Sequence, residues 1–467
     1  MLFNSVRFFL FFGLVLALFY SARGEARKWI LLVASYGFYA AWNWKFVPLL
    51  LTLTVIDYTA AVWMSRVRPE RKKLLLLMSV LANLSFLGFF KYYNFLAANL
   101  ATVFGMGESA LALGIVLPLG ISFHTLQSIS YVVDVYRGEQ KPITSPLDYA
   151  LFICFFPQLV AGPIVRARTF FRDLYNWRSP SADDWATGIL TITLGLVKKM
   201  AFADHLAVVA DSYFNNVDAQ SGILNAWSAC AAFILQVYFD FSGYTDIAIG
   251  SARLLGFHFP ANFNRPFLAA NLTELWRRWH ISFSTWIRDY IYVPLASGRR
   301  GEASIYGNLM ITMALAGLWH GASWNFIVWG AYHGTLLCFE RMWRVRHRRR
   351  PQGGESVVDL HLLQVACTFL LFAMGAPFFR LAAFSDAMHV VGQLFTGPPG
   401  TILLNSWQIG LLALSLVVAQ GEEKFRWFER IATGPVWVYA GGLTLLLVCL
   451  ALFGVTDNYV PFVYFQF

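Results

Sequence analysis

The chain has 467 residues, of which 58% are hydrophobic, 17% aromatic and 13% charged, and its mean hydropathy is +0.54. Soluble domains average about 25% charged residues, so this composition excludes an ordinary soluble protein and indicates a membrane protein. The formal net charge is +10, but the basic residues gather at the ends of apolar runs, as cytoplasmic anchors do. Without a zinc-finger spacing or a soluble basic face, nucleic acid is not an expected partner.

The first part of the chain predicts successive membrane spans. We interpret residues 5–21 as a retained helix and not a cleaved signal peptide, because only Arg7 precedes the apolar core and the run continues into another span. Basic residues gather in the linkers 23–28 and 66–73. The positive-inside rule therefore places both linkers in the cytoplasm and the N-terminus outside. The spans predicted after the first are residues 29–44, 46–64 and 74–90.

The pattern loosens over residues 110–166, where Pro157, Gly162 and Pro163 interrupt apolar sequence. Irregular backbone at bilayer depth survives only where protein or a water-filled cavity surrounds it. We therefore expect this segment to line a cavity and to be partly re-entrant.

Two long apolar segments follow, residues 183–214 and 222–250. Asp183 and Asp184 are typical of a helix start. Asp240 and Asp246 lie within membrane-type sequence, where carboxylates usually face the interior of a bundle. A structural role and a substrate contact both remain open for this pair.

Further spans are expected near residues 360–379, 403–419 and 435–455. The arginine-rich run 341–350 reads as a topological anchor, with contact to lipid headgroups or a charged donor as the alternative. We predict an all-α polytopic membrane protein of about eleven spans, with re-entrant or interfacial helices. It would form one membrane-embedded domain, divided into N-terminal spans (1–109), a core (110–350), and C-terminal spans with an aromatic tail (351–467).

The stretch from Asn271 to Gly334 carries the candidate chemistry, with His280, His320 and His333 set among tryptophans. Apolar residues at helical spacing predict one continuous amphipathic helix over residues 271–295, with His280 at the border of its two faces. The apolar stripe consists of Leu272, Trp276, Trp279, Phe283, Trp286 and Tyr290.

Neutral imidazole suits this setting, because it avoids burying a fixed charge and can accept a hydroxyl proton near neutral pH. Hydrogen-bonded packing is the alternative role for each of the three histidines. No metal site is expected, because the acidic and histidine residues lack a ligand spacing and the five cysteines lie far apart, without a CxxC pair. The sequence contains no GxSxG elbow and no phosphate-binding glycine loop.

Residues 277–295 (RRWHISFSTWIRDYIYVPL) and 317–334 (GLWHGASWNFIVWGAYHG) resemble the two signature segments of the membrane-bound O-acyltransferase family. The segments FFPQLVAGPIVR, ISFHTLQSISYVVDVYRG, FSGYTDIAIG and NFNRPF resemble its bacterial polysaccharide-modifying branch, most closely the alginate and cellulose O-acetylation membrane proteins. The resemblance covers nearly the whole chain in the expected order. It implies a funnel-shaped helical protein of the bacterial inner membrane, with a central tunnel across the bilayer.

The same resemblance assigns roles to residues. His320 corresponds to the family's invariant histidine and would be the general base, and His280 corresponds to its second, frequently polar position. His333 lies outside that pair and is expected to be structural. Tyr464, in the terminal FVYFQF, matches a tyrosine thought to accept the acyl group, and an aromatic interface anchor is the alternative. The expected donor-binding residues are Trp319, Trp324, Asn271, Asp289, Arg277 and Arg278. On charge alone, Arg277, Arg278, Arg299 and Arg300 would meet the phosphates of CoA if their segment faces the cytoplasm.

The expected activity is therefore acetyl transfer from cytoplasmic acetyl-CoA, a substrate and not a bound cofactor, toward an exported polysaccharide. The resemblance also implies a periplasmic serine-dependent acetyltransferase partner, the exopolysaccharide synthesis and export machinery, and surrounding lipid. One alternative is a transporter or flippase of an acyl or glycan precursor, with Asp134, Asp240 and Asp246 along its path. The absence of an internal two-fold repeat weighs against it. Another alternative keeps the chemistry but uses a lipid or protein acceptor.

Overall fold

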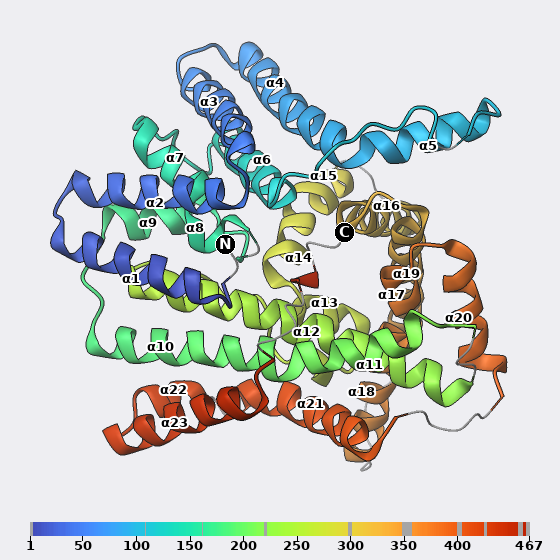
Figure 1. The fold of residues 1–467 in the computed structure, drawn as a ribbon. Coiled ribbons are helices and arrows are strands. Elements are labelled where there is room, and N and C mark those ends of the chain that lie inside the picture. Colours follow the sequence, from blue (N-terminus) through green and yellow to red (C-terminus); the bar gives the residue numbers. More distant parts are fainter. Residues whose placement is uncertain are drawn as a thin grey trace. The chain divides into compact units, whose positions relative to one another are not determined.

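The computed structural model describes residues 3–463, apart from 108, 161, 219–221, 298–300, 348–356, 399–403, 425–426 and 456–460. Side chains at 357–360, 422–424, 427 and 429 also lie outside the description. Every regular element in the described part is a helix (Figure 1), which confirms the all-α prediction.

Six helical runs among the described residues are long and apolar enough to cross a membrane. Two consecutive predicted spans are joined in one of them, where α2 (Glu25–Asn43) and α3 (Val47–Met64) flank a single 3-10 turn, η1 (Trp44–Phe46). Two shorter apolar helices are α1 (Val6–Ser21) and the part Ser406–Gly421 of α21 (Ser406–Lys424). The six runs are Glu25–Met64, Pro69–Val103, Ala182–Phe214, Ile223–Leu254, His361–Arg380 and Val436–Phe453.

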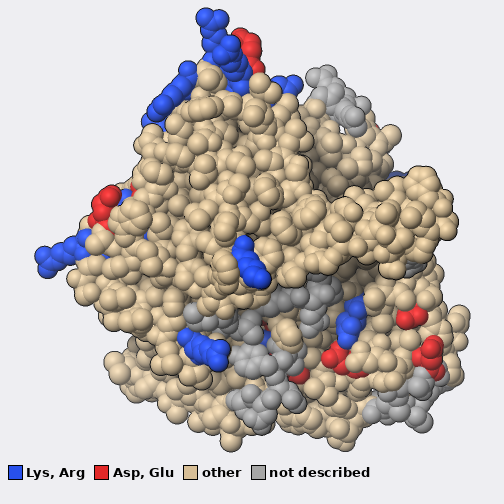
Figure 2. Space-filling view, turned by 45° about the horizontal axis from the view of Figure 1, so that its top comes forward, with Lys and Arg blue, Asp and Glu red and all other residues tan. Residues whose placement is uncertain are grey.

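The surface matches a lipid-facing protein. Large apolar side chains such as Leu10, Val55 and Leu445 are more than half exposed, which in water would be unfavourable. The face drawn in Figure 2 carries few charges, with some lysines and arginines at its top and left edges and others lying singly across it. This largely uncharged surface supports a membrane protein.

The chain forms two compact units, and the first comprises Met1–Ile192 and Tyr244–Pro260. In this unit α3 packs against α4 (Pro69–Leu87) and α6 (Ile121–Arg137), and α2 packs against α7 (Pro146–Cys154). Asp57 of α3 is fully buried and accepts hydrogen bonds from Ser79 Oγ (2.6 Å) and Asn83 Nδ2 (2.8 Å) of α4. This buried polar contact fixes the relative height of the two helices.

The interrupted segment 110–166 contains short helices and one mostly buried helix. α6 is buried over most of its length, and α7 and α8 (Phe156–Leu159) follow it. Gly120 adopts φ +72°, and a side chain there would lie 2.5 Å from the carbonyl oxygen of Leu159. The space beside it, lined by Leu119, His124 and Leu159 among others, measures only about 10 Å³. That volume holds about one water molecule, and the expectation that this segment lines a larger cavity stays a prediction.

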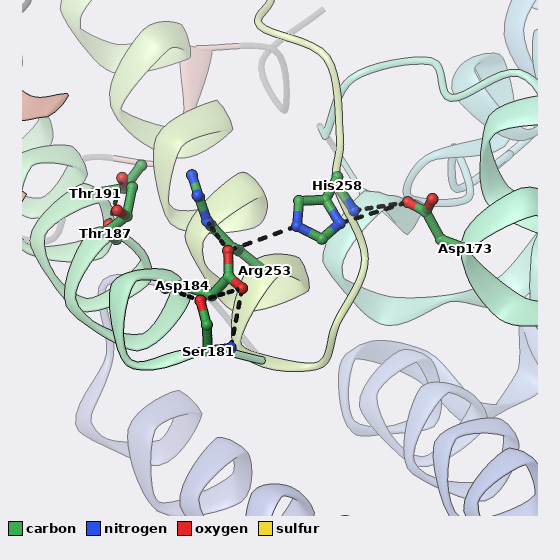
Figure 3. Close-up of polar contacts among 7 residues, drawn as sticks. All are labelled: Asp173, Ser181, Asp184, Thr187, Thr191, Arg253 and His258. Carbon is green, nitrogen blue, oxygen red and sulfur yellow. Dashed lines mark hydrogen bonds and ion pairs between the residues drawn. The ribbon is translucent and has the colours of Figure 1, made fainter. Parts of the chain in front are cut away.

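The start of α10 (Ala182–Val197) carries the polar cluster of the first unit (Figure 3). Ser181 caps the helix: its backbone N–H and hydroxyl donate to Asp184 Oδ2 at 3.0 and 2.8 Å, and its Oγ accepts from the Asp184 N–H at 3.2 Å. This reciprocal capping confirms the helix start predicted from the paired aspartates. The other carboxylate oxygen of Asp184 binds Arg253 Nε at 3.0 Å and lies 3.6 Å from His258 Nε2.

The second unit comprises Thr193–Gly243 and Ala261–Phe467. Its central feature is a hairpin of α16 (Glu302–His320) and α17 (Trp324–His347). A side chain at Gly317 would lie 2.0 Å from the Phe326 carbonyl oxygen, and one at Gly330 would lie 2.2 Å from that of Met313. The two backbones approach this closely only because both positions are glycine.

The prediction of one continuous helix over 271–295 was wrong. The structure has α13 (Leu272–Arg278), a break at Trp279 and His280, then α14 (Ile281–Ile287), the π-helix η5 (Arg288–Tyr292) and α15 (Val293–Ala296). His280 lies at φ 42°, ψ 55°, in the left-handed region that few non-glycine residues adopt. His280 therefore sits in a break between two helices and not on the border of a helix face.

Candidate active site

The backbone at His280 is held by the loop that precedes α13. Asn262 O accepts the Ile281 N–H at 2.8 Å, and Asn264 N–H donates to Arg278 O at 2.9 Å. Arg265 in the same loop is also left-handed, at φ 46°. The loop residues 262–264 thus supply the hydrogen bonds that α13 and α14 lose at their break, and strained backbone of this kind is concentrated at functional sites.

The side chain of Asn262, which is 1% exposed, orients the imidazole of His280. Its Oδ1 accepts the Ser282 N–H at 3.1 Å and the Ser282 hydroxyl at 2.9 Å, and it lies 3.3 Å from His280 Nδ1. Since an N–H donor marks this atom as the acceptor, His280 Nδ1 carries the proton and Nε2 carries the lone pair. Burial also lowers the pKa of His280 to about 3, so the ring is neutral at physiological pH.

His320 is the last residue of α16 and is 6% exposed. Its ring contacts Trp319 (4.9 Å between centroids), Trp329 (5.3 Å) and Phe379 (5.1 Å). The carbonyl end of a helix carries partial negative charge, which stabilises the imidazolium that forms when a histidine accepts a proton.

Phe283 connects the two histidines. Its ring lies 5.1 Å from that of His280 and 5.5 Å from that of His320, and it stacks on Trp319 at 4.2 Å. The structure therefore brings together three of the predicted residues, His280, Trp319 and His320, around one phenylalanine. Their aromatic surroundings exclude water and weaken screening of any charge that develops there.

His333 lies deeper in the unit, with its ring 4.7 Å from Trp329 and 5.3 Å from Trp276. It is fully buried, and neither ring nitrogen has a hydrogen-bond partner among the described residues. Gly375 also packs on it, since a side chain there would lie 3.1 Å from Nε2. These contacts give His333 a packing environment, and its expected structural role stays a prediction.

A cavity of about 430 Å³ opens beside this group. Phe283 lines it together with Arg277 of α13 and Arg288 of η5. Thr312 of α16 also lines it, and its buried hydroxyl has no hydrogen-bond partner in the described structure. The cavity therefore combines an apolar wall next to the histidines with two guanidinium groups, as a ligand with an acyl end and an anionic end requires.

The other predicted donor-binding residues have local partners. Asn271 caps α13 by accepting the Glu274 N–H at 2.9 Å, and Arg278 pairs with Glu274. Asp289 pairs with the neighbouring Arg288 at 2.8 Å, and Trp324 is 58% exposed at the start of α17. Their role in donor binding stays a prediction. Tyr464, Arg299 and Arg300 lie outside the described residues.

Asn262 and Ser282 belong to the site but were not predicted from the sequence. Asn262 lies in the motif NFNRPF, which carried the resemblance without a role of its own. The helix break at His280 leaves backbone groups that need hydrogen-bond partners, and Asn262 supplies one. The local pattern of apolar residues does not reveal this break. The described residues contain no cluster of three or more His, Cys, Asp and Glu side chains able to hold a metal ion.

Comparison with known proteins gives a consistent result. The sequence model of the membrane-bound O-acyltransferase family matches residues 38–375. The chain is 40% identical to a probable alginate O-acetylase of Azotobacter vinelandii, over 89% of this chain and 83% of that protein. It is 39% identical to a probable alginate O-acetylase of Pseudomonas putida, over 99% of both chains. A peptidoglycan O-acetyltransferase of Helicobacter pylori is 36% identical over 78% of this chain and 73% of that protein.

Proposed function

The chain belongs to the membrane-bound O-acyltransferase family and is an O-acyltransferase, and we propose that it passes acetyl groups from cytoplasmic acetyl-CoA to an exported polysaccharide. Relatives named for alginate and peptidoglycan support a polysaccharide acceptor, and an alginate-type or cellulose-type polymer fits best. The proposed location is the inner membrane of a bacterium. The observation that carries the proposal is the pair of buried histidines on Phe283, next to a cavity with two arginines.

In this proposal His320 is the general base. It takes the proton of the attacking hydroxyl while that oxygen forms a bond to the thioester carbonyl carbon. The carbon–sulfur bond then breaks, and the thiolate leaves with the proton returned by His320 as free CoA. Its position at the carbonyl end of α16 favours the imidazolium between these two proton transfers.

His280 has a different proposed role, because its neutral ring presents an acceptor at Nε2 and a proton at Nδ1 that points to Asn262. A fixed neutral imidazole orients a hydroxyl or the donor by hydrogen bonding without adding charge. Phe283 keeps the two rings in one apolar environment. We assign His280 to positioning and His320 to proton transfer.

The cavity between α13, α14 and α16 is the proposed donor site. Arg277 and Arg288 would bind the phosphates of CoA, since guanidinium groups form bidentate contacts with phosphate oxygens. The acetyl end would then reach toward Phe283 and the histidines. Binding of this kind needs no residue from outside the second unit.

The first acyl acceptor is proposed to be the phenol of Tyr464. Its oxygen would attack the thioester and yield an acetyl aryl ester, itself an activated donor, which a second hydroxyl then cleaves to restore the phenol. The neighbouring residues support this role, because Phe462 and Val463 are each 2% exposed and Phe462 contacts the Phe241 ring at 5.7 Å. Phe241 in turn contacts His280 at 4.6 Å.

The final acceptor requires a partner. A polymer outside the membrane needs an extracytoplasmic binding domain, so we propose a periplasmic serine-dependent acetyltransferase that takes the acetyl group onward. The partner would belong to the same polysaccharide synthesis and export machinery.

The test is CoA release by the purified protein. With acetyl-CoA and the partner, wild type should release CoA, and His320→Ala should reduce the rate by about a hundredfold or more, the usual range for a lost general base. His333→Gln serves as the matched control for replacing a buried histidine. Equal rates for His320→Ala and wild type would remove His320 from the chemistry, and no thioester cleavage at all would favour transport of a precursor.

A further inference from the structure

A buried charge cluster lies within the second unit, away from the cavity. Lys199 Nζ contacts Asp204 Oδ1 at 2.8 Å and Asp240 Oδ1 at 2.6 Å, and all three side chains are at most 4% exposed. Lys199 belongs to a π-helix, η3 (Lys198–Ala203), inserted before α11 (Asp204–Phe214). Burying three charges is costly, and π-helical turns are frequently found at functional sites. We call these three residues the Lys199 cluster.

The Lys199 cluster contacts the C-terminal tail, the chain that follows α23 (Val436–Phe453). Asp240 Oδ2, the oxygen that does not face Lys199, accepts the Val463 N–H at 2.7 Å in a buried hydrogen bond. The start of the tail is held by the same π-helix, because the Val455 N–H donates to Met200 O at 3.1 Å. The tail is thus held at two residues that are eight positions apart. Val455 binds the π-helix η3 itself, and Val463 binds Asp240, which forms an ion pair with Lys199 of η3.

The same residues lead to the histidines. Phe241 follows Asp240 on α12 (Ile223–Leu254), and its ring contacts both Phe462 at 5.7 Å and His280 at 4.6 Å. The hydrogen bond to Val463 therefore fixes the tail next to the candidate active site. Tyr464 is the following residue in the sequence.

We propose that Asp240 is a positioning residue whose carboxylate, oriented by its ion pair with Lys199, docks the chain's own tail at Val463, the residue before Tyr464. This inference rests on the proposed relay through Tyr464. A charged acceptor makes a stronger hydrogen bond to a backbone N–H than a neutral one does. A stronger hydrogen bond to the tail accounts for burying charged side chains here, which packing alone does not require.

The test removes each side of the hydrogen bond separately. Val463→Pro deletes the tail N–H and leaves the Lys199 cluster intact, and Val463→Ala keeps the N–H as its control. Asp240→Asn weakens the acceptor, and Asp57→Asn is the control for neutralising a fully buried carboxylate elsewhere. The measurements are the rate at which a carboxypeptidase removes the C-terminal residues, and kcat and KM for acetyl-CoA-dependent CoA release.

We expect Val463→Pro and Asp240→Asn to lose the tail residues to the protease about tenfold faster than wild type, as for one lost hydrogen bond to a charged group. Both should lower kcat with KM for acetyl-CoA unchanged, and the double variant should be no worse than either single one. The two control variants should match wild type in protease rate.

Equal protease rates in all four variants would overturn the docking. Faster digestion with unchanged kcat would overturn the positioning role. If wild type releases no CoA, the proposed function fails, but the protease comparison still decides whether Asp240 holds the tail.

Discussion

At the scale of single residues, the site depends on a histidine in an unfavourable backbone conformation. His280 is left-handed, fully buried and bound through Nδ1 to Asn262. The arrangement leaves a neutral ring with its lone pair at Nε2. The imidazole stays unprotonated here because the cost of burying a charged ring exceeds the free energy gained by binding a proton in the working pH range.

The neutral state of His280 makes stability depend on pH. Burial lowers its pKa from 6.5 to about 3, so between these values the unfolded chain binds a proton that the folded chain does not. The stabilisation is therefore present above pH 6.5 and lost as pH falls from 6.5 toward 3, by up to about 1.4 kcal/mol per pH unit. His280→Asn, which tolerates the left-handed backbone but does not titrate, should lose less stability on acidification.

Thermal unfolding in detergent at about pH 7.5 and about pH 5, on either side of the ordinary histidine pKa, measures this difference. The other histidines are present in both proteins, so their contributions cancel when the losses of stability are compared. Parallel loss of stability in wild type and His280→Asn would contradict a neutral, buried His280.

The guanidinium groups at the cavity support a second prediction at this scale. Arg277→Gln and Arg288→Gln should each raise KM for acetyl-CoA about tenfold, because each removes one charged contact to phosphate. Arg346→Gln, an exposed arginine near the end of α17, is the control and should leave KM unchanged. Steady-state CoA release measures all three, and unchanged KM in both cavity variants would place the donor elsewhere.

The sequence predicted which residues form the site, but it did not predict their geometry. The resemblance singled out His320 and His280, and the structure brings both rings onto Phe283. The helical period failed at His280 because apolar residues recur at the same spacing on both sides of the break. The hydrogen bonds that stabilise the break come from Asn262, and a local period carries no information on a partner 18 residues away.

At the scale of elements, the hairpin of α16 and α17 sets the position of His320. Gly317 and Gly330 allow the two backbones to touch, and His320 follows Gly317 by one helical turn. A larger side chain at Gly317 or Gly330 would therefore separate the two helices and move His320, the proposed base.

Gly317→Ala tests this geometry. The added methyl would lie 2.0 Å from the Phe326 carbonyl oxygen, so the helices must separate, at a cost of about 1–3 kcal/mol in stability. Gly307→Ala, on the same helix but with no atom within 4 Å of the added methyl, should be neutral or stabilise by up to about 1 kcal/mol. The unfolding temperature and the rate of CoA release should both fall in Gly317→Ala, and neither should fall in Gly307→Ala. Comparable behaviour of the two variants would show that the close approach does not position His320.

Helix starts were more predictable than helix continuity. Paired aspartates identified the start of α10, because capping is a local interaction between Ser181 and Asp184. Short 3-10 and π-helical turns, such as η1 between α2 and α3, join successive apolar runs into longer ones and have no clear apolar signature. Their effect on the number of spans could not be predicted from hydropathy.

At the scale of the whole molecule, composition alone indicated a membrane protein, and the family match supplies the activity. Among the described residues, the pocket along residues 110–166 measures about 10 Å³, whereas a cavity of about 430 Å³ lies beside α13, α14 and α16. Broken apolar sequence indicated irregular backbone correctly, since turns separate the helices α6, α7 and α8. Which segments enclose space depends on long-range packing, and that is not encoded in any single segment.

A covalent acetyl relay driven by His320 leaves an acetylated protein, which mass spectrometry of the intact protein after incubation with acetyl-CoA detects. Wild type should gain the mass of one acetyl group in place of one hydrogen, located at Tyr464 by fragmentation. His320→Ala and Tyr464→Phe should gain nothing. Acetylation of Tyr464→Phe at wild-type level, or CoA release by wild type and partner with no acetylated intermediate, would contradict the relay and leave the tail as an anchor.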